Sequence, residues 1–119
     1  MKKVMVLGAS PNKRRFSHTC VKTLMHQGYE VIPIGAREGE INGKKIIQGK
    51  PSVEDLHTVT LYLSPRNQEE YYDYVFGQNP QRIIFNPGAE NPNFADLAKK
   101  NGIEVVEDCT LVMLNSGNF

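Results

Sequence analysis

The residues with the clearest chemistry follow the first apolar run of the chain, residues 4–7. A loop of small residues comes first, then three cations, then a serine at the start of a helical pattern. Such a loop exposes backbone N–H groups at the positively polarised N-terminus of a helix, where a phosphate group is the natural ligand. We therefore predict a nucleotide or nucleotide-like ligand held by Gly8, Ala9, Ser10, Pro11, Asn12, Lys13, Arg14, Arg15 and Ser17.

This loop is not the dinucleotide-binding fingerprint, because that pattern needs three glycines and only Gly8 is present. The alternative interpretation is a plain turn between a strand and a helix, with Lys13, Arg14 and Arg15 as a solvated charge run. The cations lie where a helix N-terminus already favours an anion, which favours phosphate binding over that alternative.

The loop after the second apolar run distinguishes between nucleotides. An NAD site usually ends its second strand with a carboxylate that accepts hydrogen bonds from the ribose hydroxyls. Here the run leads through Gly35 to Arg37, and a guanidinium suits a phosphorylated ribose. This predicts NADP or coenzyme A, which carries a 3′-phosphate; a surface arginine in a polar loop is the alternative. The expected contacts are Pro33, Ile34, Gly35 and Arg37.

Two later apolar runs also end in loops of small residues, which let a ligand approach the backbone closely. In a parallel sheet, ligands bind beyond the carboxyl ends of the strands, near the point where strand order reverses. We expect these loops to line the same groove; their residues are Ser64, Pro65, Asn86, Pro87 and Gly88.

The elements that must position these loops are short apolar runs alternating with amphipathic segments. The runs are typical of strands buried on both faces and cover residues 4–7, 30–34, 59–63, 82–85 and 104–106. Short connections between alternating strands and helices imply a parallel sheet with right-handed crossovers. We predict one α/β domain over residues 1–119: a Rossmann-like, doubly wound, mainly parallel five-stranded sheet with helices on both faces.

The helices carry signals at their ends. Ser17 suits an N-cap, and Phe16 before it is expected to pack on Val21. Two later helices are expected to begin at Ser64-Pro65 and Asn91-Pro92, and the three are expected to end at Gly28, Gly77 and Gly102. The polar, Gly-rich residues 37–52 are expected to form a loop with room for a short edge strand.

A composition of 39% hydrophobic and 23% charged residues is that of an ordinary globular domain. The length of 119 residues is enough for one hydrophobic core and too short for two domains. A net charge of +1 gives no overall field that would attract nucleic acid or an anionic membrane. No apolar run approaches the roughly 20 residues of a membrane span, and the first residues lead directly into a strand, so we expect no signal peptide. Two cysteines without metal-ligand spacing favour a cytoplasmic location.

The histidines and cysteines do not form a catalytic pattern. His18, His26 and His57 have no serine, cysteine or paired carboxylate at the spacing of a relay or a metal site. Only His18 is near the predicted phosphate loop, where it could donate to it. We interpret Cys20 and Cys109 as small buried side chains rather than reactive thiols. We therefore predict no catalytic and no metal-binding residues.

Taken in order, these segments resemble the CoA-binding domain family, a Rossmann-like module found at the N-terminus of succinyl-CoA synthetase alpha subunits and as small standalone bacterial proteins. The resemblance implies bound coenzyme A, with its phosphates at residues 8–13, its adenosine end at residues 33–37, and residues 64–65 and 86–88 further along the groove. Family members often carry Asn or His followed by Pro where Gly35-Ala36 stand. The matching segments are residues 8–11 with Arg15 and Ser17, and residues 28–34, 40–43, 58–65, 85–88, 90–92 and 103–114.

The resemblance does not imply ligase activity, because the synthetases need a phosphohistidine and a nucleotide-grasp domain that this sequence does not show. We expect non-catalytic binding of a small-molecule nucleotide ligand, coenzyme A or an acyl-CoA. The alternatives are an NADP-binding redox enzyme or sensor, and an interaction module that binds no ligand. The sequence leaves open whether the chain pairs with a second copy or with another protein.

Overall fold

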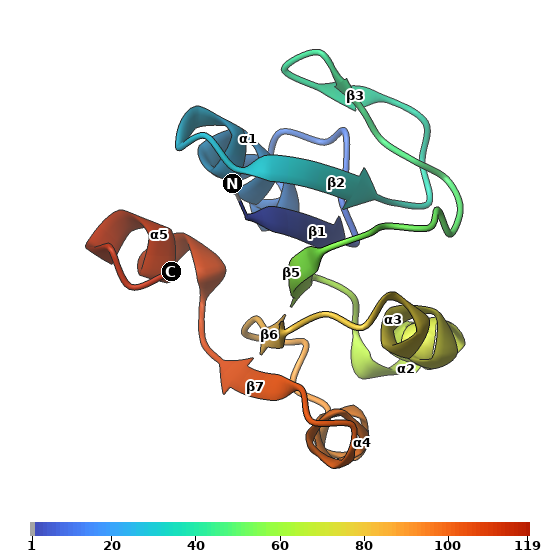
Figure 1. Cartoon of the computed structure of the whole chain (residues 1–119). Helices are drawn as coiled ribbons and strands as arrows, with labels where there is room; N and C mark the ends of the chain where they lie inside the picture. Colours follow the sequence, from blue (N-terminus) through green and yellow to red (C-terminus); the bar gives the residue numbers. More distant parts are fainter. Residues whose placement is uncertain (1) are drawn as a thin grey trace.

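The computed structural model describes residues 2–119. Five strands form one parallel sheet in the order β2-β1-β5-β6-β7 (Figure 1). β1 lies between β2 and β5, so the chain first builds toward one edge of the sheet and later toward the other. The predicted Rossmann-like, doubly wound α/β fold is confirmed. The strands are β1 (Lys3–Leu7), β2 (Glu30–Ile34), β5 (Leu56–Leu61), β6 (Arg82–Phe85) and β7 (Glu104–Glu107).

Helices cover both faces of this sheet (Figure 1). α1 and α5 pack with Val4 and Val6 of β1, whereas α3 and α4 pack with Met5 and Leu7 on the other face. Because successive side chains of a strand point to opposite faces, this alternation gives each side its own apolar layer. The helices are α1 (Phe16–His26), α2 (Pro65–Gln68), the 3-10 turn η1 (Glu69–Tyr71), α3 (Tyr72–Gln78), α4 (Pro92–Lys100) and α5 (Thr110–Ser116).

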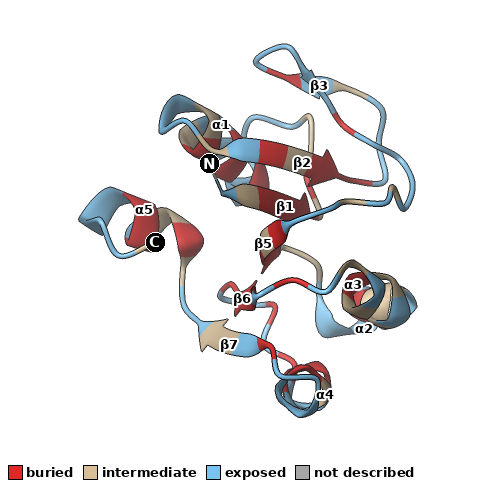
Figure 2. Ribbon diagram, in the orientation of Figure 1, coloured by how far each residue is buried: buried red, intermediate tan, exposed pale blue. Residues whose placement is uncertain are grey.

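The central strands are buried almost throughout (Figure 2). All four residues of β6 are buried, and so are the last four of β1. The hydroxyl-bearing Thr58 and Thr60 of β5 are fully buried as well. Parallel strands covered on both faces have this pattern. The loops at the carboxyl ends of these strands are therefore attached to a closely packed part of the sheet.

β5 differs from the predicted strand in a way that concerns the site. The sequence predicted a strand over residues 59–63, but β5 runs from Leu56 to Leu61. Tyr62 and Leu63 consequently lie in the loop beyond the strand, where they are half-buried.

α1 also begins earlier than predicted. Ser17 lies inside its first turn, and Arg15 takes the N-cap position without a side-chain hydrogen bond. The predicted Ser17 cap is therefore wrong. The predicted packing of Phe16 on Val21 is also wrong, because Phe16 is 74% exposed whereas Val21 is fully buried.

The other helix ends follow the sequence more closely. Gly28 and Gly102 come directly after the C-caps of α1 and α4 with positive φ, as expected of glycines that stop helices. α3 instead continues through Gly77 and ends at Gln78, followed by Asn79 in the left-handed region. α5 was not predicted. No helix within residues 2–119 is both long and apolar enough to cross a membrane.

Residues 37–52 contain a small hairpin instead of a helix. β3 (Glu40–Ile41) pairs with β4 (Lys44–Lys45) in antiparallel fashion. Ile41 packs in the same apolar cluster as the buried residues of α1 and β1. The turn is formed by Asn42 and Gly43, both with positive φ, the combination that tight hairpin turns favour. Beyond the hairpin a single bridge joins Ile47 to the end of β2.

Candidate functional site

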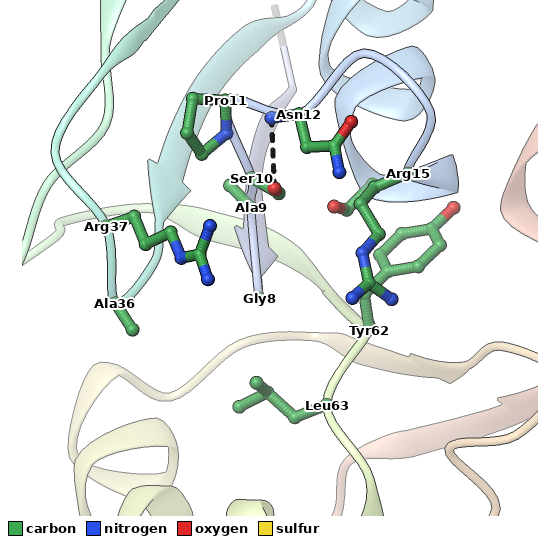
Figure 3. Close-up of a pocket in the computed structure, with 11 residues that line it drawn as sticks. Gly8, Ala9, Ser10, Pro11, Asn12, Arg15, Ala36, Arg37, Tyr62 and Leu63 are labelled. Atoms are coloured by element: carbon green, nitrogen blue, oxygen red, sulfur yellow. Dashed lines mark hydrogen bonds between the residues drawn. The ribbon is translucent and has the colours of Figure 1, made fainter.

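A cavity of about 350 Å³ lies at the carboxyl ends of β1 and β5, where the strand order reverses. Ligands of doubly wound sheets bind at this kind of position. The volume is within the usual range for a small-molecule site. The cavity is lined by Gly8, Ala9, Ser10, Pro11, Asn12, Arg15, Ser17, Ala36, Arg37, Tyr62 and Leu63 (Figure 3).

Most of the predicted phosphate loop lines this cavity, but several predicted residues lie outside it. Lys13 and Arg14 are exposed beside it, and Pro33, Ile34 and Gly35 are buried behind it. The residues of the two later loops are also absent from its lining: Ser64, Pro65, Pro87 and Gly88 are exposed and Asn86 is buried.

Tyr62 and Leu63 line the cavity but were not predicted as site residues. Ala36, which also lines it, lies within the range 33–37 that the resemblance assigned to the adenosine end. Tyr62 and Leu63 were assigned to a strand that in fact ends at Leu61. A correct strand end would have placed both at the carboxyl edge.

The first and second loops are joined very closely at the base of the cavity. The N–H groups of Gly8 and Ala9 both donate to the carbonyl oxygen of Ile34, at 2.9 Å each. A Cβ on Gly35 would overlap the carbonyl oxygen of Ala9. Glycine is therefore required at position 35 by close approach. The N–H groups of Gly8 and Ala9 serve the fold and are not available to a ligand.

The rest of the loop is held by bonds to its own residues. The N–H of Asn12 donates to Oγ of Ser10 at 3.1 Å (Figure 3), and the N–H of Arg14 donates to Oδ1 of Asn12 at 3.0 Å. Within residues 2–119 no hydrogen bond uses the N–H groups of Ser10, Phe16 or Ser17. The uncapped N-terminus of α1 thus presents free donors beside the cavity.

Two guanidinium groups flank these donors. Arg15 and Arg37 extend from opposite sides of the loop toward the mouth of the cavity (Figure 3). Ser17 adds a side chain that is only 4% exposed and whose hydroxyl has no hydrogen-bond partner within the described chain. Together these groups form a compact set of donors without a carboxylate in the lining, an arrangement suited to an anion.

The cavity wall on the β5 side is uncharged. Burial raises the pKa of the Tyr62 hydroxyl well above its usual range. Burial likewise raises the pKa of Cys20 to about 12. Both groups stay protonated at neutral pH, so neither adds negative charge near a bound anion. The prediction that Cys20 belongs to the core is confirmed, whereas Cys109 is half-buried at the N-cap of α5.

Asn86, predicted to line the groove, instead lies beneath it and is only 2% exposed. Its Nδ2 donates to Oγ1 of Thr60 at 2.7 Å and to the carbonyl of Leu61 at 2.8 Å. Its Oδ1 accepts from the N–H of Thr110 at 2.8 Å. All of these bonds are internal, so Asn86 joins β5, β6 and the start of α5.

We expect Asn86→Ala to lower the free energy of unfolding by about 2–3 kcal/mol, because it leaves buried partners unsatisfied. Urea unfolding measures the change, and Asn93→Ala, at an exposed position of α4, is the matched control. An unfolding midpoint equal to that of the control would contradict this role.

Gln68 joins the loop after β5 to the loop after β6 through side-chain hydrogen bonds. It is fully buried, and its Nε2 donates to the carbonyls of Leu63 and Ala89, each at 2.8 Å. Its Oε1 accepts from Asn91, which also caps α4 through the N–H of Phe94. A glutamine in a polar segment gives no sequence signal for such a bridge.

The parallel sheet with helices on both faces is a Rossmann-like domain, and its switch point carries free helix donors and two arginines, a candidate site for a phosphate group. The model of the CoA binding domain family matches residues 2–115. The chain belongs to this family.

Solved structures share this fold. A crystal structure of an uncharacterized protein is 45% identical to this chain and superposes on it with a TM-score of 0.97. The match covers 100% of this chain and 98% of that one. A hypothetical protein from Pyrococcus horikoshii OT3 is 26% identical, with a TM-score of 0.84 over 97% of this chain and 82% of that one.

A curated relative is much longer. The carbamoyl phosphate synthase large chain of Gemmatimonas aurantiaca is 26% identical over 98 residues, which cover 76% of this chain. This chain spans only 8% of that protein's length. The activity of the large chain is therefore not transferred to it.

Proposed function

We propose that this chain is a single-domain protein that binds coenzyme A or an acyl-CoA without catalysing a reaction on it. The observation that carries the proposal is the set of free donors at the N-terminus of α1, flanked by Arg15 and Arg37, in a chain of the CoA binding domain family. A reducing cytoplasm, in which both cysteines stay free thiols, is the location we propose.

The residues present fit the two charged parts of coenzyme A. The diphosphate would be held by the N–H of Ser10, by Ser17 and by Arg15, which lie together at the helix N-terminus. Arg37, on the other side of the loop, would pair with the 3′-phosphate of the ribose. A guanidinium binds such a phosphate through two parallel hydrogen bonds.

The chemistry of the wall supports binding over catalysis. A general base or nucleophile near the cavity would need a pKa close to neutrality or a deprotonated thiol. The phenol of Tyr62, which lines the cavity, and the thiol of Cys20, which is buried outside the lining, have raised pKa values instead. We therefore assign these two groups to packing.

NADP is the second candidate, because the 2′-phosphate of its ribose would also suit Arg37.

Thermal unfolding with CoA, acetyl-CoA, NADP, NAD or no ligand separates the candidates. At about 100 times its dissociation constant a ligand adds about 2.7 kcal/mol, or several degrees in Tm. We expect CoA and acetyl-CoA to raise Tm and the others not to. A shift with NADP alone would support a redox function, and no shift with any would support an interaction module.

Ser17→Ala tests the buried hydroxyl. We expect the Kd for CoA, measured by calorimetry, to rise about tenfold or more, because one hydrogen bond to a charged group is lost. The unfolding midpoint should hardly change, since the hydroxyl bonds nothing within the described chain. Ser52→Ala, at an exposed position away from the cavity, should bind as the unaltered protein does. Equal affinities for both variants would remove Ser17 from the site.

A further inference from the structure

His18 is a buried histidine directly behind the phosphate loop. It lies in the first turn of α1, is only 5% exposed and does not line the cavity. Its Nδ1 lies 2.9 Å from the carbonyl oxygen of Ser10. A carbonyl can only accept, so Nδ1 carries the proton and is the donor of this bond. The sequence-based expectation was that His18 could donate to the phosphate loop, and its Nδ1 is directed to the Ser10 carbonyl of that loop.

The peptide bond that His18 contacts has a single hydrogen-bonding group, its carbonyl. It joins Ser10 to Pro11, and proline has no N–H, so the carbonyl of Ser10 is the only group through which a hydrogen bond can fix this peptide. If this carbonyl turned toward the cavity, its oxygen would repel a phosphate. Bonded to His18, it points into the buried side of the loop.

Fixing this carbonyl also fixes its neighbours. Oγ of Ser10 accepts from the N–H of Asn12, and Asn12 in turn holds the N–H groups of Arg14 and Arg15. The geometry of Ser10 is thus transmitted along the loop to the N-cap of α1.

We infer that His18 is a positioning residue: through Nδ1 it holds the Ser10–Pro11 peptide in the one orientation that leaves the loop open to an anion. The inference rests on the proposed function, because the anion meant is the diphosphate of coenzyme A. It concerns preorganisation, in which affinity is gained by removing the cost of ordering the loop on binding.

The test compares His18→Leu, which fills the space without a donor, with His18→Asn, whose amide nitrogen can take the place of Nδ1. His26→Asn, on the exposed side of the same helix, is the control. Calorimetry should show the Kd for CoA raised about tenfold in His18→Leu, the loss expected for about one hydrogen bond, and largely restored in His18→Asn. The control should match the unaltered protein. If both His18 variants bind CoA as the unaltered protein does, the positioning role is wrong.

A second readout needs no ligand. Hydrogen exchange should be faster at the N–H of Asn12 in His18→Leu, while the N–H of Ala9, bonded to Ile34, should keep its protection. In the unaltered protein, ¹⁵N spectra should show the proton of His18 on Nδ1. Unchanged exchange at the N–H of Asn12, or a His18 ring whose only proton is on Nε2, would overturn the inference. If CoA fails to bind the unaltered protein, the proposed function fails, while these two measurements still decide the role of His18.

Discussion

Gly35→Ala is expected to destabilise the fold by about 3 kcal/mol and to remove ligand binding with it. The added Cβ would overlap the carbonyl oxygen of Ala9, and both groups belong to backbone that the sheet holds in place. To relieve the overlap, the loops after β1 and β2 must separate. That movement breaks the bonds from the N–H groups of Gly8 and Ala9 to the carbonyl of Ile34.

Urea unfolding measures the loss, and Gly49→Ala is the matched control. A Cβ at position 49 would meet nothing within 4 Å, and the residue has no positive φ. The control should unfold at the midpoint of the unaltered protein. A Gly35→Ala variant as stable as the control would show that the loops after β1 and β2 do not meet closely at Gly35.

Arg37→Ala is expected to raise the Kd for CoA about tenfold or more, the effect of losing a charge-assisted hydrogen bond to a phosphate. The same change should hardly affect dephospho-CoA, because that ligand lacks the 3′-phosphate. The comparison of two ligands on one variant separates a specific contact from a general loss of positive charge.

Calorimetry with both ligands measures the difference, and Arg66→Ala, on an exposed position of α2 outside the cavity, controls for net charge. The control should retain the unaltered preference for CoA. Equal losses of affinity for CoA and dephospho-CoA in Arg37→Ala would contradict the assignment of Arg37 to the ribose phosphate.

The fold could be predicted because its signals are local. Each buried strand is a short apolar run, and Asn91 caps its helix at the predicted place. α5 was missed because it is short and its start depends on a distant partner: the N–H of Thr110 bonds the side chain of Asn86. Neither residue shows this connection in sequence.

The candidate site was predicted in part for a related reason. Gly8, Ser10, Arg15 and Arg37 follow strand ends and line the cavity as expected. The sequence could not show that the N–H of Gly8 is already bonded to the neighbouring loop, or that a Cβ on Gly35 would overlap the carbonyl oxygen of Ala9. These properties depend on how two loops meet, which only the folded chain determines.

The most direct test of the central claim is a crystal structure of the protein with coenzyme A. We expect the diphosphate within hydrogen-bond distance of the N–H of Ser10, the hydroxyl of Ser17 and the guanidinium of Arg15, with the 3′-phosphate on Arg37. Coenzyme A bound elsewhere on the sheet, or a cavity that holds only water at saturating ligand, would contradict this expectation.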